Sequence, residues 1–333
     1  SPPTGPVNCG GKATLTAEGS TAQQNAIALF NKDWGLLCAG KNLAYNPTGS
    51  GAGRDQFIAA HVDFAGSDSP LSHDQIAPAA ARCHGHPAWH LPMVFGPVAI
   101  AYHLNGVKDL VVSADVLAKI FSGGIDNWSD PAVVALNRGV ALPHLKISPI
   151  YRSDSSGTTD NFQKYLTAAA PKSWVRGTGS EFQGGVGEGA QKSAGVIQAV
   201  QSTPGAIGYV EKGFADQSGV AYAQINGGNG AVKLTDDAAR NAIDNVTFAG
   251  AGNDLRLDLN SLYSTKEAGA YPLVLATYEI VCSKGYDPAT TAAVKSLLMV
   301  AAQNAQGGLA AAGYVALPDK FKQRLIAAIN AIG

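Results

Sequence analysis

The chain has 333 residues, enough for roughly two domains, and its 24 Lys and Arg residues nearly balance its 25 Asp and Glu residues. A formal charge of −1 with only 15% charged residues gives no polyelectrolyte field for nucleic acid or an anionic membrane, so any anion must be bound at a local site. The hydrophobic residues, 46% of the chain, form no apolar run long enough for a membrane-spanning helix.

The chain opens with SPPTGP, which indicates a flexible tether over residues 1–10. Beyond it, one pattern recurs: a short apolar or β-branched run, a turn of Gly, Ser and Thr, and a stretch with helical spacing. The pattern covers residues 12–34, 43–60, 62–81 and 146–166. This order is typical of βα units and predicts an α/β protein with a mostly parallel sheet.

Two long apolar strands are predicted at residues 91–103 and 271–283. They suggest a chain that leaves one domain, builds a second and returns. We therefore predict a first lobe made of residues 1–90 and 276–333, and a second lobe made of residues 91–275. A helical pattern closes the first lobe, with apolar residues at Phe321, Leu325, Ile326, Ala328 and Ile329. A cleft between two such lobes is the default place for a ligand.

Each of the four turns places Gly, Ser or Thr just before a helix. Unpaired backbone N–H groups and the positive end of the helix dipole favour an anion at such a position. For any single turn, simple N-capping is the better explanation. Four turns in one chain, one of them with Arg152 beside Asp154, favour an anion site. GSGAG at 49–53 lacks the Lys-Ser/Thr end of a P-loop, so nucleotide binding is not expected.

Several of these segments resemble the motifs of one known family. They are GST at 19–21, TGSGAG at 48–53, DFAGSDSPLS at 63–72, RSDSSGTTDNF at 152–162, GAIGYVEKGFA at 205–215 and the stretch at 115–143. In this order they are similar to the phosphate-binding protein of bacterial phosphate ABC transporters, from about residue 12 to the C-terminal helix. The resemblance implies a two-lobed periplasmic-binding-protein-like fold of type II. In that fold, each lobe is a mixed, mostly parallel sheet flanked by helices, and two crossing strands form the hinge.

The resemblance also implies a set of ligand-binding residues for phosphate and no catalysis. The first lobe would contribute Thr21, the backbone N–H of Ala22, Ser50 and Asp68, and the second lobe Arg152, Ser156, Gly157 and Thr158. Asp154 would orient the Arg152 guanidinium through a fork-like pair. Ala22 departs from the larger apolar residue that relatives often carry, which leaves a backbone donor intact.

Asp68 is the expected determinant of anion choice. Phosphate near neutral pH still carries a proton, which a carboxylate can accept, whereas sulfate and molybdate offer only lone pairs. Arsenate carries a proton as phosphate does, so Asp68 would not exclude it. The alternative ligands are therefore other tetrahedral oxyanions: arsenate, sulfate and molybdate. The simpler interpretation of Asp68 is an N-cap for a helix over 69–80.

Other chemistries find less support in the sequence. An enzyme with Ser50 or Ser156 as nucleophile would need the G-x-S-x-G setting, which neither serine has. The cluster CHGHPAWH at 83–90 could suggest metal binding, but Pro87 interrupts a helical face, and we expect a solvated loop instead of a metal site. Trp128 and Trp174 are expected in the core or in the walls of the cleft, not as a platform for sugars. No cofactor, metal or nucleic-acid partner is expected.

Four cysteines with no CxxC spacing indicate two disulfides in an oxidising compartment. Three connectivities are possible. If the two long strands run antiparallel, Cys83 and Cys282 lie at the same end, and Cys9 and Cys38 meet at one end of a βα unit. We therefore expect the pairs Cys9–Cys38 and Cys83–Cys282.

The resemblance further implies where the protein works and with what. It implies a monomer on the outer face of the cytoplasmic membrane, anchored by lipid through a Cys upstream of Ser1 that this chain lacks. Its partners would be inorganic phosphate and the permease and ATPase subunits of a phosphate ABC transporter.

Overall fold

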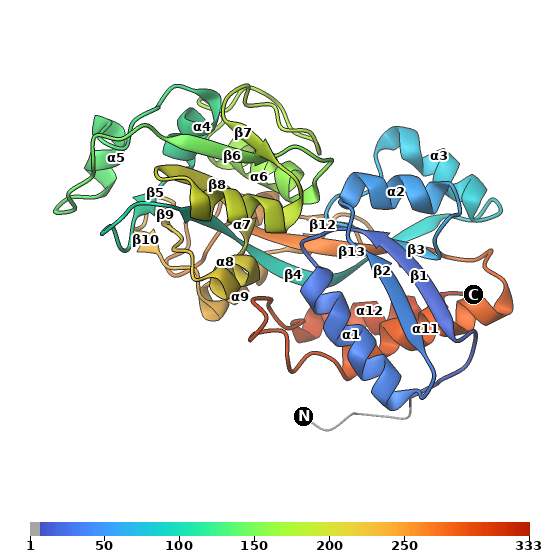
Figure 1. The fold of residues 1–333 in the computed structure, drawn as a ribbon. Coiled ribbons are helices and arrows are strands. Elements are labelled where there is room, and N and C mark those ends of the chain that lie inside the picture. The colour runs from blue at the N-terminus through green and yellow to red at the C-terminus, as the bar shows by residue number, and fades with distance from the viewer. Residues whose placement is uncertain (1–6) are drawn as a thin grey trace. The chain divides into compact units, whose positions relative to one another are not determined.

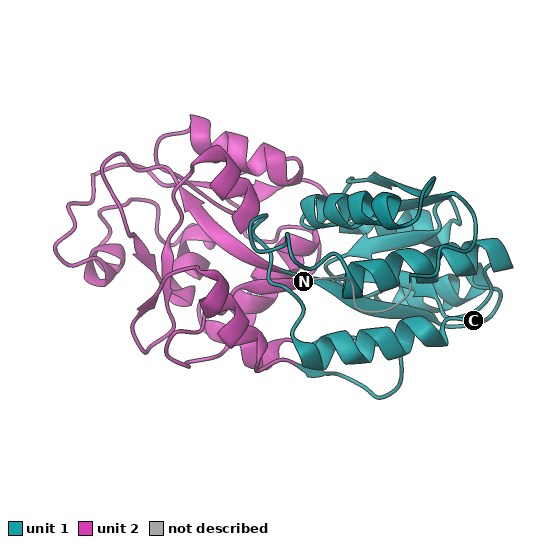
Figure 2. Ribbon diagram, turned by 90° about the horizontal axis from the view of Figure 1, so that it is seen from below, with its two compact units in different colours: residues 1–95, 247–258, 276–333 teal, residues 96–246, 259–275 magenta. Residues whose placement is uncertain are grey.

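The structure, a computed structural model, describes residues 7–333 (Figure 1). They divide into two compact units, coloured separately in Figure 2. Unit 1 holds the described residues up to Phe95 together with Thr247–Asp258 and Ala276–Gly333, and unit 2 holds Gly96–Val246 and Leu259–Leu275. Both β4 (Ala88–Tyr102) and β13 (Val274–Cys282), the two long strands expected from the sequence, contain a boundary between the units.

Unit 1 is built on a sheet in which β1 pairs in parallel with β2 and β3, and β13 pairs antiparallel with β3. Figure 1 shows α2 and α3 on one side of these strands, and α1, α11 and α12 on the other. The elements of unit 1 are β1 (Thr14–Gly19), α1 (Gln24–Leu37), β2 (Asn42–Asn46), α2 (Ser50–Ile58), β3 (Phe64–Ser67), α3 (His73–Arg82), β11 (Thr247–Phe248), β12 (Leu257–Asp258), α11 (Pro288–Gln303) and α12 (Asp319–Ala331). The three βα units predicted at the start of the chain are confirmed.

Burial explains why these segments fold as they do. In β1, Leu15 and Ala17 are buried and alternate with more exposed residues, as expected for a strand with one covered face. In α1, Phe30 and Trp34 are four residues apart and therefore face the same side. The Trp34 indole Nε1 donates a 2.9 Å hydrogen bond to Ser296 Oγ on α11, so α1 is fixed to the C-terminal helices.

Unit 2 has its own sheet, in which β6 pairs in parallel with β7 and β8, and β8 pairs antiparallel with β4. Its elements, besides parts of β4 and β13, are β5 (Val111–Val112), α4 (Ala114–Ser122), α5 (Pro131–Leu136), β6 (Ser148–Arg152), α6 (Gly157–Ala169), β7 (Glu188–Ala190), α7 (Lys192–Ser202), β8 (Ala206–Glu211), α8 (Lys212–Ser218), β9 (Gln224–Asn226), β10 (Ala231–Val232), α9 (Asp236–Ile243) and α10 (Asn260–Tyr263). Trp128 and Trp174 are buried here, so both belong to the core.

One segment lies in a different unit from the one expected. Residues 247–258 fall within the predicted second lobe, but the structure packs them in unit 1. The backbone N–H of Leu255 donates to His90 O at 2.9 Å, and that of Leu257 donates to Tyr278 Oη at 3.0 Å. These contacts are made by partners far away in the chain, so the local sequence carries no sign of them.

Two disulfides are present, and one of them holds the start of the described chain in place. Of the tether expected over residues 1–10, residues 1–6 lie outside the described part, while residues 7–10 are held in place. Cys9 pairs with Cys38, and Lys41 Nζ donates to Gly10 O at 3.1 Å. Cys83 pairs with Cys282, so both disulfides join the expected partners. Within residues 7–333, no helix combines the length and apolar character that crossing a membrane requires.

Candidate functional site

In unit 1, three of the expected anion-binding turns meet at one edge of the sheet. Because β1, β2 and β3 are parallel, their carboxyl ends lie together, and Thr21, Ser50 and Asp68 follow these ends. Gly19 allows the end of β1 to lie close to Gly66 of β3. It has a positive φ of 138°, and a Cβ there would lie 2.0 Å from Gly66 O.

Asp68 is buried at 4% exposure and accepts hydrogen bonds from hydroxyl groups on three different segments. Ser20 Oγ and Thr277 Oγ1 each donate to Oδ1 at 2.6 Å, and Ser50 Oγ donates to Oδ2 at 3.3 Å. Hydroxyl donors stabilise the ionised form of a carboxylate. The alternative interpretation of Asp68 as an N-cap is wrong, because α3 begins at His73 and its N-cap is Ser72.

The turn that leads into α1 is held from behind by two tyrosines. Tyr45 Oη donates to Ser20 O at 2.7 Å, and Tyr314 Oη donates to Ala22 O at 2.6 Å. Thr21 and Ala22 are each 1% exposed. With its carbonyls fixed by side chains, the turn presents a preorganised helix N-terminus, where the dipole favours negative charge.

In unit 2, Arg152 and Asp154 form the expected fork. Arg152 Nε donates to Asp154 Oδ1 at 2.7 Å, and Nη2 donates to Oδ2 at 2.6 Å, with Arg152 only 3% exposed. Burial acts to lower the pKa of Arg152, but the Asp154 carboxylate outweighs it and raises that pKa. Burial likewise acts to raise the pKa of Asp154, and the bonds from Arg152 reverse this, so its pKa lies below the usual value.

The N-terminus of α6 carries the other expected residues of unit 2. Ser156 is the N-cap and its Oγ accepts from the N–H of Thr159 at 3.1 Å, so the capping interpretation is correct for this residue. Gly157 and Thr158 are the first two helical residues, whose N–H groups have no intrahelical partner. The Thr158 hydroxyl is directed elsewhere, because Oγ1 donates to Glu211 Oε2 at 2.8 Å.

Three residues of these arrangements were not singled out from the sequence. They are Ser20 and Thr277, which donate to Asp68, and Glu211, which accepts from both Thr158 and Ser193. Each lies inside a segment that the sequence did identify. Their orientation depends on which face of a strand or turn they occupy, and only the folded sheet shows this.

The segment 83–90 was expected to be a solvated loop, but its last residue is buried. His90 is 3% exposed and begins the buried part of β4. Its Nε2 accepts from the N–H of Leu71 at 2.9 Å, and Nδ1 lies 2.8 Å from Asp254 Oδ1, so the neutral ring carries its proton on Nδ1. Within residues 7–333, no group of three or more His, Cys, Asp or Glu residues could hold a metal ion.

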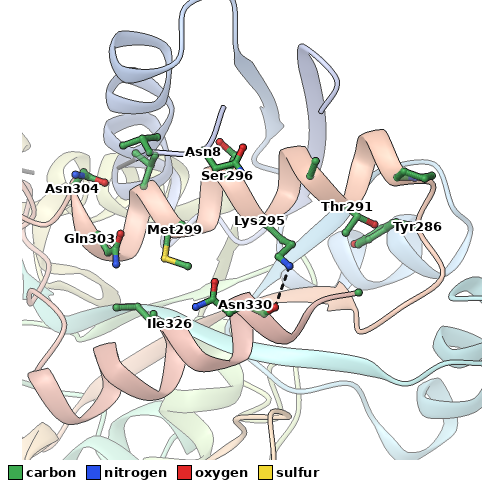
Figure 3. Close-up of a pocket in the computed structure, with 15 residues that line it drawn as sticks. Asn8, Tyr286, Thr291, Lys295, Ser296, Met299, Gln303, Asn304, Ile326 and Asn330 are labelled. Atoms are coloured by element: carbon green, nitrogen blue, oxygen red, sulfur yellow. Dashed lines mark hydrogen bonds between the residues drawn. The ribbon is translucent and has the colours of Figure 1, made fainter. Parts of the chain in front are cut away.

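A separate cavity of about 740 Å³ lies in unit 1 along α11 and α12 (Figure 3). Met299, Val300 and Ile326 supply apolar lining. Lys295 also lines it, but its Nζ donates to the carbonyls of Asn330 and Ile332 at 3.1 and 2.9 Å and thereby caps the end of α12. None of the residues expected to bind an anion lines this cavity.

Comparison with known proteins identifies the family. A model of the PBP superfamily domain matches residues 8–300. Phosphate-binding protein PstS 3 of Mycobacterium tuberculosis (strain H37Rv) is 49% identical over 328 residues, covering 98% of this chain and 88% of that protein. Phosphate-binding protein PstS of Xylella fastidiosa is 30% identical over 318 residues, covering 93% and 83%.

Solved structures agree on the fold. A high-affinity periplasmic phosphate-binding protein (PfluDING) bound with phosphate matches with a TM-score of 0.75 and 23% identity, covering 94% of this chain and 93% of that one. The phosphate-binding protein from Stenotrophomonas maltophilia matches with a TM-score of 0.72 and 19% identity, covering 95% and 94%. The predicted α/β periplasmic-binding-protein-like fold is thus confirmed. The chain belongs to the PBP superfamily and, within it, to the PstS phosphate-binding proteins.

Proposed function

We propose that this protein binds inorganic phosphate outside the cytoplasm and delivers it to an ABC-type phosphate importer. The observation that carries the proposal is Asp68, a buried carboxylate held by three hydroxyl groups at an edge of the sheet where helix N-termini gather. The 49% identity to phosphate-binding protein PstS 3 supports it. The family is one of binding proteins and not of enzymes.

The residues proposed to bind phosphate are divided between the sequences of the two units. In unit 1, the donors would be Thr21, the backbone N–H of Ala22 and Ser50, with Asp68 accepting the proton that phosphate still carries. In unit 2, they would be Arg152, Ser156 and the N–H groups of Gly157 and Thr158, with Asp154 orienting the guanidinium. A charge-assisted hydrogen bond contributes about 1.5 to 3 kcal/mol net, so a few such donors suffice for tight binding.

The same arrangement would discriminate among oxyanions. A ligand without a proton would place its lone pairs against the Asp68 carboxylate, which costs free energy in a buried site. Sulfate and molybdate should therefore bind poorly. Arsenate carries a proton as phosphate does, and competition between the two is expected.

Isothermal titration of phosphate-stripped protein at neutral pH tests this function. We expect one phosphate per chain, with binding unchanged by excess sulfate and reduced by arsenate. Binding of sulfate in place of phosphate would contradict the role of Asp68 while preserving an anion-binding function. Binding of none of these anions would overturn the proposed function.

The two disulfides support an extracytoplasmic location, since such bonds persist in oxidising compartments. We further propose a lipid anchor upstream of this chain, and the permease and ATPase subunits of a phosphate importer as partners. Reconstituted importer should take up phosphate only when the binding protein is supplied. Uptake at the same rate without it would exclude this partnership.

A further inference from the structure

A buried carboxyl group lies behind the proposed phosphate site without belonging to it. Glu279 is on β13, fully buried, and pairs in register with Gly66 of β3. Its Oε1 accepts from Gln23 Nε2 at 2.5 Å, and the same Nε2 donates to Tyr45 Oη at 3.2 Å. Tyr45 in turn donates to Ser20 O, so a chain of hydrogen bonds connects Glu279 to the turn that carries Thr21.

The side chains of Gln23 and Tyr45 pack closely against the backbone of Gly66. A Cβ on Gly66 would lie 2.1 Å from Gln23 Nε2 and 2.7 Å from Tyr45 Oη, so a side chain opposite Glu279 would displace the ends of these two side chains. Gln23 is also the N-cap residue of α1 and is fully buried. The position of the Gln23 amide therefore depends on Glu279 and bears directly on the start of α1.

Glu279 differs from Asp68 and Asp154 in having only one neutral donor, the Gln23 amide, to compensate a negative charge. Asp68 has three hydroxyl donors, and Asp154 has a guanidinium. The structure provides Oε2 of Glu279 with no hydrogen-bond partner, and within residues 7–333 no ion pair involves this residue. An ionised carboxylate in that setting costs more free energy than the protonated acid, whose neutral O–H forgoes only one hydrogen bond.

The titratable groups that face this cluster are Asp68, Tyr45 and Tyr314. The pKa of Glu279 is raised to about 8, mainly by burial; the hydrogen bond from Gln23 acts to lower it, and the Asp68 charge acts to raise it. Burial also raises the pKa of Tyr45 well above its usual value, so this hydroxyl keeps its proton through the neutral range.

We propose that Glu279 is a positioning residue of the phosphate site that acts in its protonated form, so that phosphate binding takes up a proton wherever Glu279 is ionised in the free protein. This inference rests on the proposed function. Neutral Glu279 holds Gln23 and the α1 turn without adding negative charge behind Asp68. A bound phosphate adds negative charge on the same side of Glu279 as Asp68, and so favours the protonated acid further.

The direction of the pH dependence follows from this linkage. Phosphate raises the pKa of Glu279 above its value of about 8 in the free protein, so the bound state holds more protons than the free state at higher pH. Phosphate affinity therefore falls as the pH rises through this range. One pH unit above the free-state pKa, the loss is about tenfold relative to a protein in which residue 279 cannot ionise.

The test compares wild-type protein with Glu279→Gln, which keeps the size and neutrality of the protonated acid. Phosphate is titrated calorimetrically at pH 7 and pH 9, in buffers with different ionisation enthalpies. We expect similar affinities at pH 7. At pH 9 the wild type should bind about tenfold more weakly than the variant and take up close to one proton more per phosphate. The protonation of free phosphate changes with pH in the same way for both proteins. The ratio of their phosphate affinities therefore reports only the ionisation of Glu279.

A matched control is Glu181→Gln, which removes an exposed carboxyl and should behave as wild type. Should Glu279→Gln fail to fold, the wild-type titration at pH 9 still decides, since an uptake of no proton overturns the inference. Equal proton uptake by wild type and Glu279→Gln would also overturn it, by assigning the proton to another group. Absence of phosphate binding at pH 7 would overturn the proposed function, whereas binding at pH 7 with no such uptake at pH 9 would overturn this inference alone.

Discussion

At the scale of single residues, the buried Asp68 and the half-buried Asp154 show two ways to stabilise a charged carboxylate. Asp68 is surrounded by hydroxyl groups, each of which has one proton and can rotate to donate it to a ligand in place of the carboxylate. Asp154 is paired with a guanidinium in a fixed fork, which orients Arg152 but leaves little freedom. The first arrangement suits a proton acceptor, and the second suits a support for a cation.

Replacing Asp68 with Asn should reduce the preference for phosphate over sulfate. The amide cannot accept the phosphate proton as strongly, and it no longer repels a fully deprotonated anion. We expect the ratio of the two affinities to fall by at least about tenfold, equivalent to one charge-assisted hydrogen bond of about 1.5 kcal/mol. Competition calorimetry measures it. Asp55→Asn, at an exposed position of α2, is the control, and an unchanged ratio in Asp68→Asn would reject the role of this carboxylate.

Replacing Asp154 with Asn should lower the free energy of unfolding by about 2–4 kcal/mol at neutral pH, because the buried guanidinium loses its counter-charge. The pKa of Asp154 is lowered in the folded state, so its contribution is present above the unfolded-state pKa and is lost as the pH falls through the folded-state pKa. The difference in the free energy of unfolding between wild type and Asp154→Asn should therefore become smaller as the pH falls.

Urea unfolding between pH 7 and pH 3 checks this behaviour. The exposed substitution Asp237→Asn, whose side chain is 90% exposed and pairs weakly with Arg240, should change stability by less than about 0.5 kcal/mol. A gap between wild type and Asp154→Asn that stays constant down to pH 3 would show that the ion pair is not its source.

At the scale of elements, the part of the proposed phosphate site in unit 1 depends on how closely α2 approaches β1. Gly53 makes this contact possible, since a Cβ there would lie 2.5 Å from Glu18 O and 2.6 Å from the Cα of Gly19. Ser50 begins the same helix. A side chain at Gly53 must therefore push the helix, and Ser50 with it, away from the turn.

We expect Gly53→Ala to lower the free energy of unfolding by about 1–3 kcal/mol, although alanine is the better helix former by about 1 kcal/mol. Phosphate affinity should fall in parallel, because Ser50 moves. Denaturant unfolding and calorimetry measure the two effects. Gly307→Ala has open space around the new methyl group and should be nearly neutral. A Gly53→Ala variant more stable than wild type would contradict the close-approach argument.

At the scale of the whole molecule, two disulfides of very different span both lie within unit 1. Cys9–Cys38 joins residues 29 apart, and Cys83–Cys282 joins residues 199 apart, with all of unit 2 between them in the chain. In the chain-entropy account, a longer closed loop restricts the unfolded state more. The second disulfide should therefore contribute more to stability.

Removing either disulfide by a pair of Cys→Ala substitutions should cost about 2–5 kcal/mol, with the loss of Cys83–Cys282 larger by about 1–2 kcal/mol. Urea unfolding of the two double variants against wild type measures the difference. Equal losses would show that strain or residual structure in the unfolded chain outweighs the loop entropy.

Local pattern in the sequence was sufficient for much of the architecture. The βα units, the two long strands, the terminal helix and the burial of both predicted core tryptophans follow from hydrophobic periodicity and turn chemistry. Asp68 and the Arg152–Asp154 fork were also identified, because the residues around them form short motifs. These features depend on residues close together in the chain, whose conformations constrain one another directly.

Only the tertiary structure decided which distant residues meet. The hydrogen bond from Thr277 to Asp68 spans 209 positions, that from Gln23 to Glu279 spans 256, and that from His90 to Asp254 spans 164. Each depends on strand register and on which face a side chain occupies. A shift of one residue would reverse every face, and no local pattern encodes the partner strand. The sequence by itself therefore determined the elements and the chemistry of the turns, while the packing of the sheet determined the supporting residues behind them.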